Sequence, residues 1–166
     1  MNERVREGLN EQVGHELEAA YLYLAMMNHF EEEGLEGFAH WMRLQAGEEV
    51  AHAMKIIDHL HDRDAAVELG AIPAPGVDFG SALEVMEAAL AHERKVTRLI
   101  DDLYDVAREE GDHPAAVMLE WFVEEQVEEE KSARDIVEML ELAGGDGPAM
   151  LMLDARMAER GGGEEG

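Results

Sequence analysis

The stretch GEEVAH, residues 47–52, places two adjacent carboxylates ahead of an imidazole. On a helix, Glu49 and His52 lie on the same face because residues three apart are neighbours there, whereas Glu48 lies about 100° around the axis. Carboxylate oxygen and imidazole nitrogen together bind divalent iron, manganese, cobalt or zinc. Acidic helices also carry this pattern by chance on their solvated faces. Taken alone, the stretch leaves open both a metal site and a solvated surface.

Three other segments also interrupt an apolar stripe of helical spacing with a carboxylate. The four central carboxylates are Glu16, Glu49, Glu93 and Glu129, each near the midpoint of its own segment. Midpoints of packed helices meet in one layer, so we expect these groups to lie together, with Glu125 and Gln126 at the edge. Buried carboxylates repel one another at a cost of several kcal/mol, and no Lys or Arg interrupts the stripes at this level. A bound cation offsets that repulsion, so the set predicts a dinuclear metal site inside a helical bundle.

The segments that carry these groups are bounded by glycine and proline and read as helices. We expect helices over residues 4–33, 37–63, 81–110 and 114–143, and a short one over 148–160. The long connection 64–80 can cross the whole bundle, which predicts an all-α topology: a four-helix bundle with one long crossover and a short fifth C-terminal helix. Residues 1–145 form the bundle, 146–160 the fifth helix of the same domain, and 161–166 a flexible tail. On the first helix, Leu22 and Met26 are expected on the outer side, facing a neighbouring subunit.

The composition excludes several classes of function. Asp and Glu number 39 against 13 Lys and Arg, a formal charge of −26, so the protein repels phosphate backbones and we expect no nucleic acid partner. There is no cysteine, which excludes thiol catalysis and iron-sulfur clusters. No apolar run of about 18 residues and no signal peptide occur, which predicts a cytoplasmic protein without a membrane partner. So acidic a surface also suits a high-salt cytoplasm, a hypothesis that melting in low and molar salt tests.

The phrases LNEQ with a following Glu16, EEVAH, AHE and WFVEEQVEEEK occur in this order. With them, residues 3–145 resemble the haem-free bacterial and archaeal ferritins. The resemblance implies a first iron held by Glu16, Glu49 and His52, and a second held by Glu49 as the bridge, Glu93 and Glu129, with Gln126 beside it. It implies Tyr23 next to the centre, able to hydrogen-bond a ligand or supply an electron. It also implies a third iron site formed by Glu48, Glu125, Glu128 and Glu129.

Two positions distinguish the chain from other di-iron bundles. Bacterioferritins and rubrerythrins carry a second Glu-x-x-His unit on the fourth helix, whereas this chain has Gln126 and Glu129 there. Bacterioferritins also bind haem through a methionine directly after the second helix's glutamate, and this chain has Val50 at that position. We therefore expect a ferritin proper, without haem.

The function implied by the resemblance is iron storage and detoxification. A ferroxidase centre with two irons per subunit would oxidise Fe(II) with O2 or H2O2, and a homo-oligomeric cage of 24 copies would store the ferric oxide. One alternative is a non-storing di-iron oxidase or peroxidase of the rubrerythrin or bacterioferritin type. A second alternative is an acidic structural bundle that binds no metal.

Overall fold

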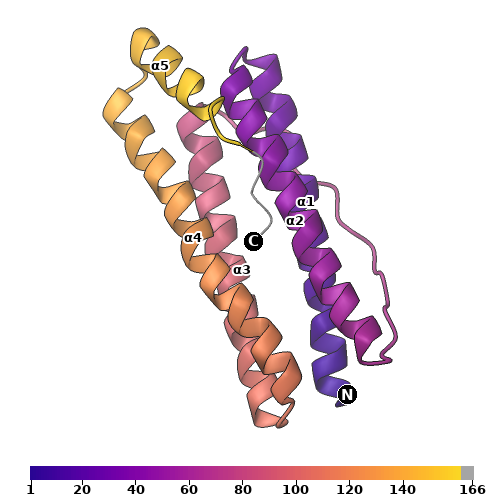
Figure 1. The fold of residues 1–166 in the computed structure, drawn as a ribbon. Helices are drawn as coiled ribbons and strands as arrows, with labels where there is room; N and C mark the ends of the chain where they lie inside the picture. The colour runs from indigo at the N-terminus through magenta and orange to yellow at the C-terminus, as the bar shows by residue number, and fades with distance from the viewer. Residues whose placement is uncertain (162–166) are drawn as a thin grey trace.

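The structure, a computed structural model, describes residues 1–161 and folds this part of the chain into five helices. They are α1 (Glu3–Glu32), α2 (Glu36–Asp62), α3 (Ala82–Glu109), α4 (His113–Ala143) and α5 (Gly147–Met157). Figure 1 shows α1 beside α2 and α3 beside α4 as antiparallel pairs, with the long α2–α3 connection running along the outside of the bundle. α5 lies across one end of the bundle, where it contacts α2 and α4. The predicted all-α bundle with one crossover and a short fifth helix is confirmed.

Side-chain caps mark the starts of α1, α3, α4 and α5, whereas α2 begins without one. Ser81 and Glu84 form a capping box at the start of α3, and the Asp112 side chain accepts from the Ala115 N–H at the start of α4. α4 ends at Gly144, whose φ of 57° belongs to the left-handed region that glycine adopts without strain. The predicted end of the fifth helix at Arg160 is wrong, because α5 ends at Met157 and the chain then turns back toward α2.

Hydrogen bonds attach the long α2–α3 connection to α1. The Arg6 guanidinium donates to the Glu68 carboxylate over 2.6 Å, and the Asn10 side chain exchanges hydrogen bonds with the Ala66 carbonyl and the Glu68 N–H. These bonds hold the first part of the connection along the bundle wall. The predicted flexible tail falls mostly on residues 162–166, which lie outside the described residues.

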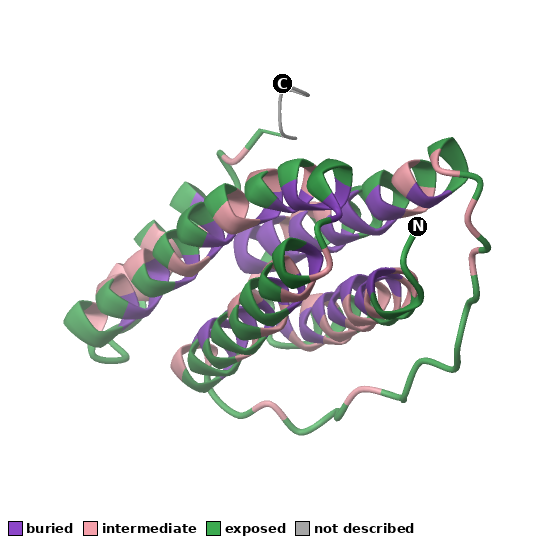
Figure 2. Ribbon diagram, turned by 90° about the horizontal axis from the view of Figure 1, so that it is seen from below, coloured by how far each residue is buried: buried purple, intermediate pink, exposed green. Residues whose placement is uncertain are grey.

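The core consists of two apolar clusters with a polar layer between them. Figure 2 shows the buried faces of the helices turned toward one another. One cluster surrounds Phe30 and Phe38 near α5, and the other surrounds Leu9 and Leu119 toward the opposite end. Met26 belongs to the first cluster and is fully buried, so its predicted place on the outer side is wrong; Leu22 is half-buried against the same cluster. None of the described helices is long and apolar enough to cross a membrane.

Candidate metal centre

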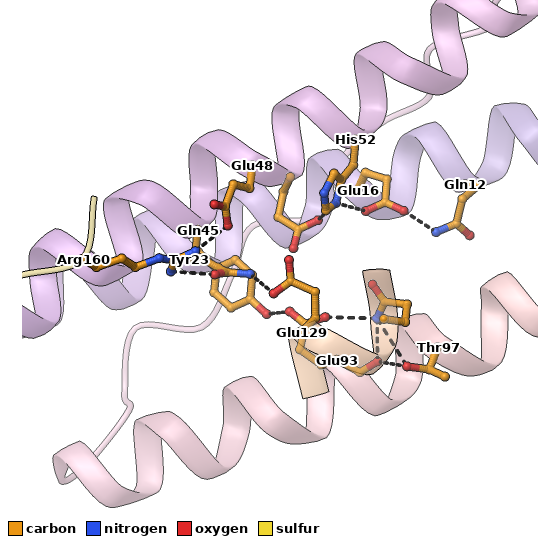
Figure 3. A network of polar contacts seen from close by, with 12 residues as sticks. Gln12, Glu16, Tyr23, Gln45, Glu48, His52, Glu93, Thr97, Glu129 and Arg160 are labelled. Carbon is orange, nitrogen blue, oxygen red and sulfur yellow. Dashed lines mark hydrogen bonds and ion pairs between the residues drawn. The ribbon is translucent and has the colours of Figure 1, made fainter. Parts of the chain in front are cut away.

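The polar layer between the two clusters contains carboxylates from all four long helices. The side chains are Glu16 from α1, Glu49 and His52 from α2, Glu93 from α3 and Glu129 from α4, none of which is more than 7% exposed. Figure 3 shows Glu16, His52, Glu93 and Glu129 converging on one region of the interior. Ionised groups at this depth destabilise a fold unless a counter-charge or hydrogen bonds compensate.

Glu16, Glu49 and His52 form a first group. Each offers one ligand atom, and these atoms all lie within 4.8 Å of one another. His52 Nδ1 lies 3.3 Å from Glu49 Oε2 and 3.8 Å from Glu16 Oε2. Neither His52 Nδ1 nor Glu16 Oε2 has a hydrogen-bond partner, although both atoms are buried. Unpartnered buried atoms of this kind call for an explanation, and a metal ion between them supplies one, so the donor set fits a divalent cation.

Neighbouring side chains hold the first group in place. The Gln12 amide donates to Glu16 Oε1 over 2.7 Å, which leaves Oε2 as the free oxygen of that carboxylate. The His52 ring packs edge-on against Trp121 and Phe122, with ring centroids 5.4 and 5.9 Å away. The ring is therefore fixed by packing, as a preorganised ligand requires.

Glu93 and Glu129 lie on the other side of the layer and have hydrogen-bond donors of their own. The Tyr23 hydroxyl donates to Glu93 Oε1, and the Gln126 amide donates to Glu93 Oε2 over 3.2 Å. The Gln45 amide donates to Glu129 Oε2 over 2.5 Å. These bonds fix the orientation of both carboxylates, and Figure 3 shows Glu93 and Glu129 next to each other.

The residues expected at a third site are only partly brought together. Glu125 and Glu129 form a second group with His52, again with ligand atoms within 4.8 Å. Glu48 is half-buried and its carboxylate accepts from Arg160, while Glu128 is exposed; neither joins a group of potential ligands among the described residues. Val50, at the position where bacterioferritins have their haem ligand, is 45% exposed on the outside of α2.

The pKa values of three carboxyl groups are raised. Burial and the charge of Glu16 raise the pKa of Glu49 well above its usual value, and burial raises that of Glu93 despite the hydrogen bonds from Tyr23 and Gln126. Burial and the charge of Glu93 raise the pKa of Glu129 from 4.5 to about 7. These carboxyl groups therefore bind a proton more tightly in the folded protein than they would in water.

The pKa values of Glu16 and His52 are shifted in the directions that favour their charged forms. Burial raises the pKa of Glu16, but His52, Glu49 and Gln12 outweigh burial and leave the pKa below its usual value. Burial lowers the pKa of His52, but the carboxylates of Glu16 and Glu49 outweigh it and raise the pKa to about 11. The pKa of Tyr23 is raised by burial and by the charge of Glu93, so the phenol stays protonated and remains a donor. The metal-free centre thus pairs an imidazolium with a carboxylate.

Several residues of the centre were not identified from the sequence. Gln12 and Gln45 lie one turn from Glu16 and Glu49 on the same buried stripes, so the helical period that identified the carboxylates also indicates them. Thr97, which accepts from the Gln126 amide, follows Glu93 at the same spacing. Arg160 lies outside the helices, so the helical spacing of buried residues cannot indicate its place in the centre.

Comparison with known proteins places the chain in a family. Residues 6–143 match the Ferritin-like domain. The chain is 38% identical over 160 residues to the bacterial non-heme ferritin of Bacteroides fragilis, covering 96% of this chain and 99% of that one. The non-heme ferritin of Staphylococcus aureus is 36% identical, with 96% of each chain covered.

Solved structures show the same relationship. The open-pore ferritin of the hyperthermophilic archaeon Archaeoglobus fulgidus superposes with a TM-score of 0.96 at 43% identity, covering 97% of this chain and 99% of that one. A humanized archaeal ferritin superposes with a TM-score of 0.97 at 41% identity, with 99% of both chains covered. The predicted resemblance is confirmed, and the chain belongs to the ferritin family.

Proposed function

We propose that the protein is an iron-storage ferritin whose subunit oxidises Fe(II) at the buried carboxylate layer. Membership of the ferritin family supports iron storage as the function. The observation that carries the proposal for this chain is the convergence of one carboxylate from each of four helices on a buried imidazole, with two ligand atoms left unpartnered. A structural bundle would gain nothing from burying four carboxyl groups at one level, where each must be protonated or paired to be tolerated.

Fe(II) is the substrate, and we assign its ligands from the geometry and the family together. Glu16, Glu49 and His52 would hold the first ion, and Glu93 and Glu129 the second, with Glu49 between them and Gln126 beside the second. Two ferrous ions held together can each give one electron to O2 or H2O2, and carboxylate oxygens stabilise the ferric product. Binding displaces the protons held by His52 and the raised carboxyl groups, since ligands must be deprotonated.

Tyr23 has a positioning role in this proposal. Its hydroxyl donates to Glu93, and its raised pKa keeps it a donor across the physiological range. A third site at the edge of the centre would be formed by Glu48, Glu125, Glu128 and Glu129, of which Glu125 and Glu129 lie with His52 in the structure.

Storage requires a closed shell, and we propose 24 copies in the cytoplasm, with no haem bound. Support comes from apolar side chains that a single subunit leaves in water. Tyr21 and Leu24 on α1 are 47% and 40% exposed, and Val50 and Met54 on α2 are 45% and 47% exposed. Exposed apolar groups on adjacent helices are a usual sign of a subunit contact. A discrete particle of about two dozen subunits by light scattering supports storage, whereas a dimer would favour the non-storing oxidase.

The test of the centre is an anaerobic Fe(II) titration of sized protein, followed by exposure to air. We expect saturation near two irons per chain, or somewhat more if the third site fills, and rapid oxidation. Glu49→Ala and His52→Ala should lose rapid oxidation, while Asp58→Ala, which removes an exposed carboxylate from the same helix, should retain it. Equal oxidation rates in all three variants would support the metal-free structural bundle instead.

A further inference from the structure

Arg160 comes shortly after α5 and lies against the middle of α2, a helix that is distant from it in sequence. Its Nη2 donates to Glu48 Oε2 over 2.5 Å, and its Nη1 donates to Gln45 Oε1 over 2.9 Å. Figure 3 shows the side chain entering the polar layer from the edge, beside Glu48 and Gln45. It is a cationic side chain in direct contact with a carboxylate assigned to iron.

Two further contacts fix Arg160 in this place. Its guanidinium lies over the Trp41 ring, 4.7 Å from the centroid, and the His40 ring N–H donates to its backbone carbonyl over 2.8 Å. Arginine stacks on aromatic faces while its fork-shaped group makes hydrogen bonds in the plane. Backbone and side chain are thus both held, which distinguishes the contact from an incidental surface ion pair.

The contact with Gln45 links Arg160 to the centre. Because the Gln45 oxygen accepts from Arg160, its amide nitrogen faces Glu129 and donates to it over 2.5 Å. Arg160 therefore engages Glu48 directly and Glu129 through one intervening side chain. Glu48 and Glu129 are two of the four residues assigned to the third iron site.

We propose that Arg160 is an internal counter-cation of the third site, which a metal ion must displace from Glu48 before it binds there. This inference rests on the proposed function, because it concerns the site through which a third iron would pass. One carboxylate oxygen cannot point its lone pairs at the guanidinium and at a metal ion in the same direction, so the two cations compete for Glu48. Arg160 thereby weakens metal binding at the edge of the centre and favours a transient ion over a resident one.

The expected change in the affinity of the third ion follows from how exposed the Arg160–Glu48 ion pair is. The side chains of Arg160 and Glu48 are 24% and 31% exposed, so the pair lies between a solvated and a buried ion pair. Breaking such a pair corresponds to roughly a three- to tenfold change in affinity. We expect the affinity of the third ion to rise by this factor in Arg160→Gln, and the first two ions to be unaffected.

Zinc titration of the assembled, metal-free protein by calorimetry tests the proposal without any oxidation chemistry. Arg156→Gln is the matched control, since it removes the same charge from an exposed position one turn earlier. Arg160→Lys should leave the third zinc close to wild-type affinity, because a lysine still places a charge beside Glu48. In a Glu48→Gln background, Arg160→Gln should change nothing, since the carboxylate for which both cations compete is gone.

Trp41 fluorescence gives a second readout. Filling of the third site should move the guanidinium off the Trp41 ring and change the emission after the second equivalent, in wild type and Arg156→Gln but not in Arg160→Gln. A third zinc with the same affinity in wild type and Arg160→Gln, or a gain that persists without Glu48, would overturn the proposal. Fewer than two tight zinc ions per chain in wild type would instead overturn the proposed centre itself, so the two failures are distinguishable.

Discussion

Replacing Glu129 by glutamine removes a buried negative charge and keeps the shape of the side chain. The oxygen that accepts the hydrogen bond from Gln45 is also retained. Glu129 is 7% exposed, and its pKa is raised from 4.5 to about 7 by burial and by the charge of Glu93. A carboxyl group whose folded pKa is raised binds its proton more tightly in the folded state. Its ionisation therefore lowers stability as the pH rises from about 4.5 through 7.

The magnitude follows from the two pKa values. Each tenfold change in proton affinity corresponds to about 1.4 kcal/mol, so ionised Glu129 lowers the stability of the metal-free protein by about 3 kcal/mol at pH 8. At pH 5 the cost is below about 1 kcal/mol, because the folded state is still protonated. Glutamine does not ionise, so Glu129→Gln should recover this difference. For a chain of this length, the gain corresponds to a rise in Tm of roughly 6–12 °C at pH 8.

Differential scanning calorimetry in EDTA at pH 5 and pH 8 measures this effect. Glu128→Gln is the control, because it removes the same charge from the adjacent, exposed position of α4. We expect a large rise in Tm for Glu129→Gln at pH 8, a small rise at pH 5, and little change for Glu128→Gln at either pH. Equal shifts in both variants, or a gain in Glu129→Gln that is the same at both pH values, would refute the reasoning.

Three further predictions concern the centre and the docking of α5. Tyr23→Phe keeps the packing but removes the hydrogen bond to the Glu93 carboxylate. By calorimetry, the affinity for the second zinc ion should fall about tenfold. An unchanged affinity would contradict the positioning role of Tyr23. The pKa of His52 is about 11, and an imidazole must be neutral to bind a metal, so zinc binding should release a proton from His52. Between pH 6 and 8, zinc affinity should therefore rise about tenfold per pH unit for each proton that binding releases. The buffer takes up a released proton, so zinc-binding heats that are the same in buffers of different ionisation heat would argue against proton release from His52. Gly37→Ala would place a methyl group against a backbone carbonyl of α5 and should lower Tm, whereas Gly47→Ala, in open space on the same helix, should not; equal effects would contradict the close packing of α5.

The fold and the central carboxylates could be predicted because both depend on periodicity. Each long helix has one central carboxylate on its apolar stripe: Glu16, Glu49, Glu93 and Glu129. The stripe shows which face of a helix is buried, whatever the neighbouring helix contributes. Met26 shows the limit of this reasoning. α1 packs against both α2 and α3, so its buried face is wider than one stripe and includes Met26 as well as part of Met27.

The contacts that tune the centre depend on tertiary structure. Arg160 reaches Glu48 only because α5 ends at Met157 and the chain turns back toward α2, and no local pattern fixes that direction. The expected third site was predicted from the family alone. In the structure, Glu48 is paired with Arg160, and Glu125 lies with His52 and Glu129.

Charge balance in the proposed centre connects its stability to its turnover. Without metal, the raised pKa values of Glu49 and Glu129 favour their neutral forms, and the raised pKa of His52 favours an imidazolium, so both reduce the negative charge of the buried layer. Four ionised glutamates and a neutral imidazole balance the charge of two ferrous ions, so Fe(II) replaces protons without leaving a net charge in the interior. Oxidation adds one positive charge per iron, and a net charge in a layer enclosed by two apolar clusters is unfavourable. In the proposed centre, ferric ions would therefore need added oxide or hydroxide to stay in place; without it they would move toward the edge of the layer, where Glu48 could receive a cation once Arg160 had moved away.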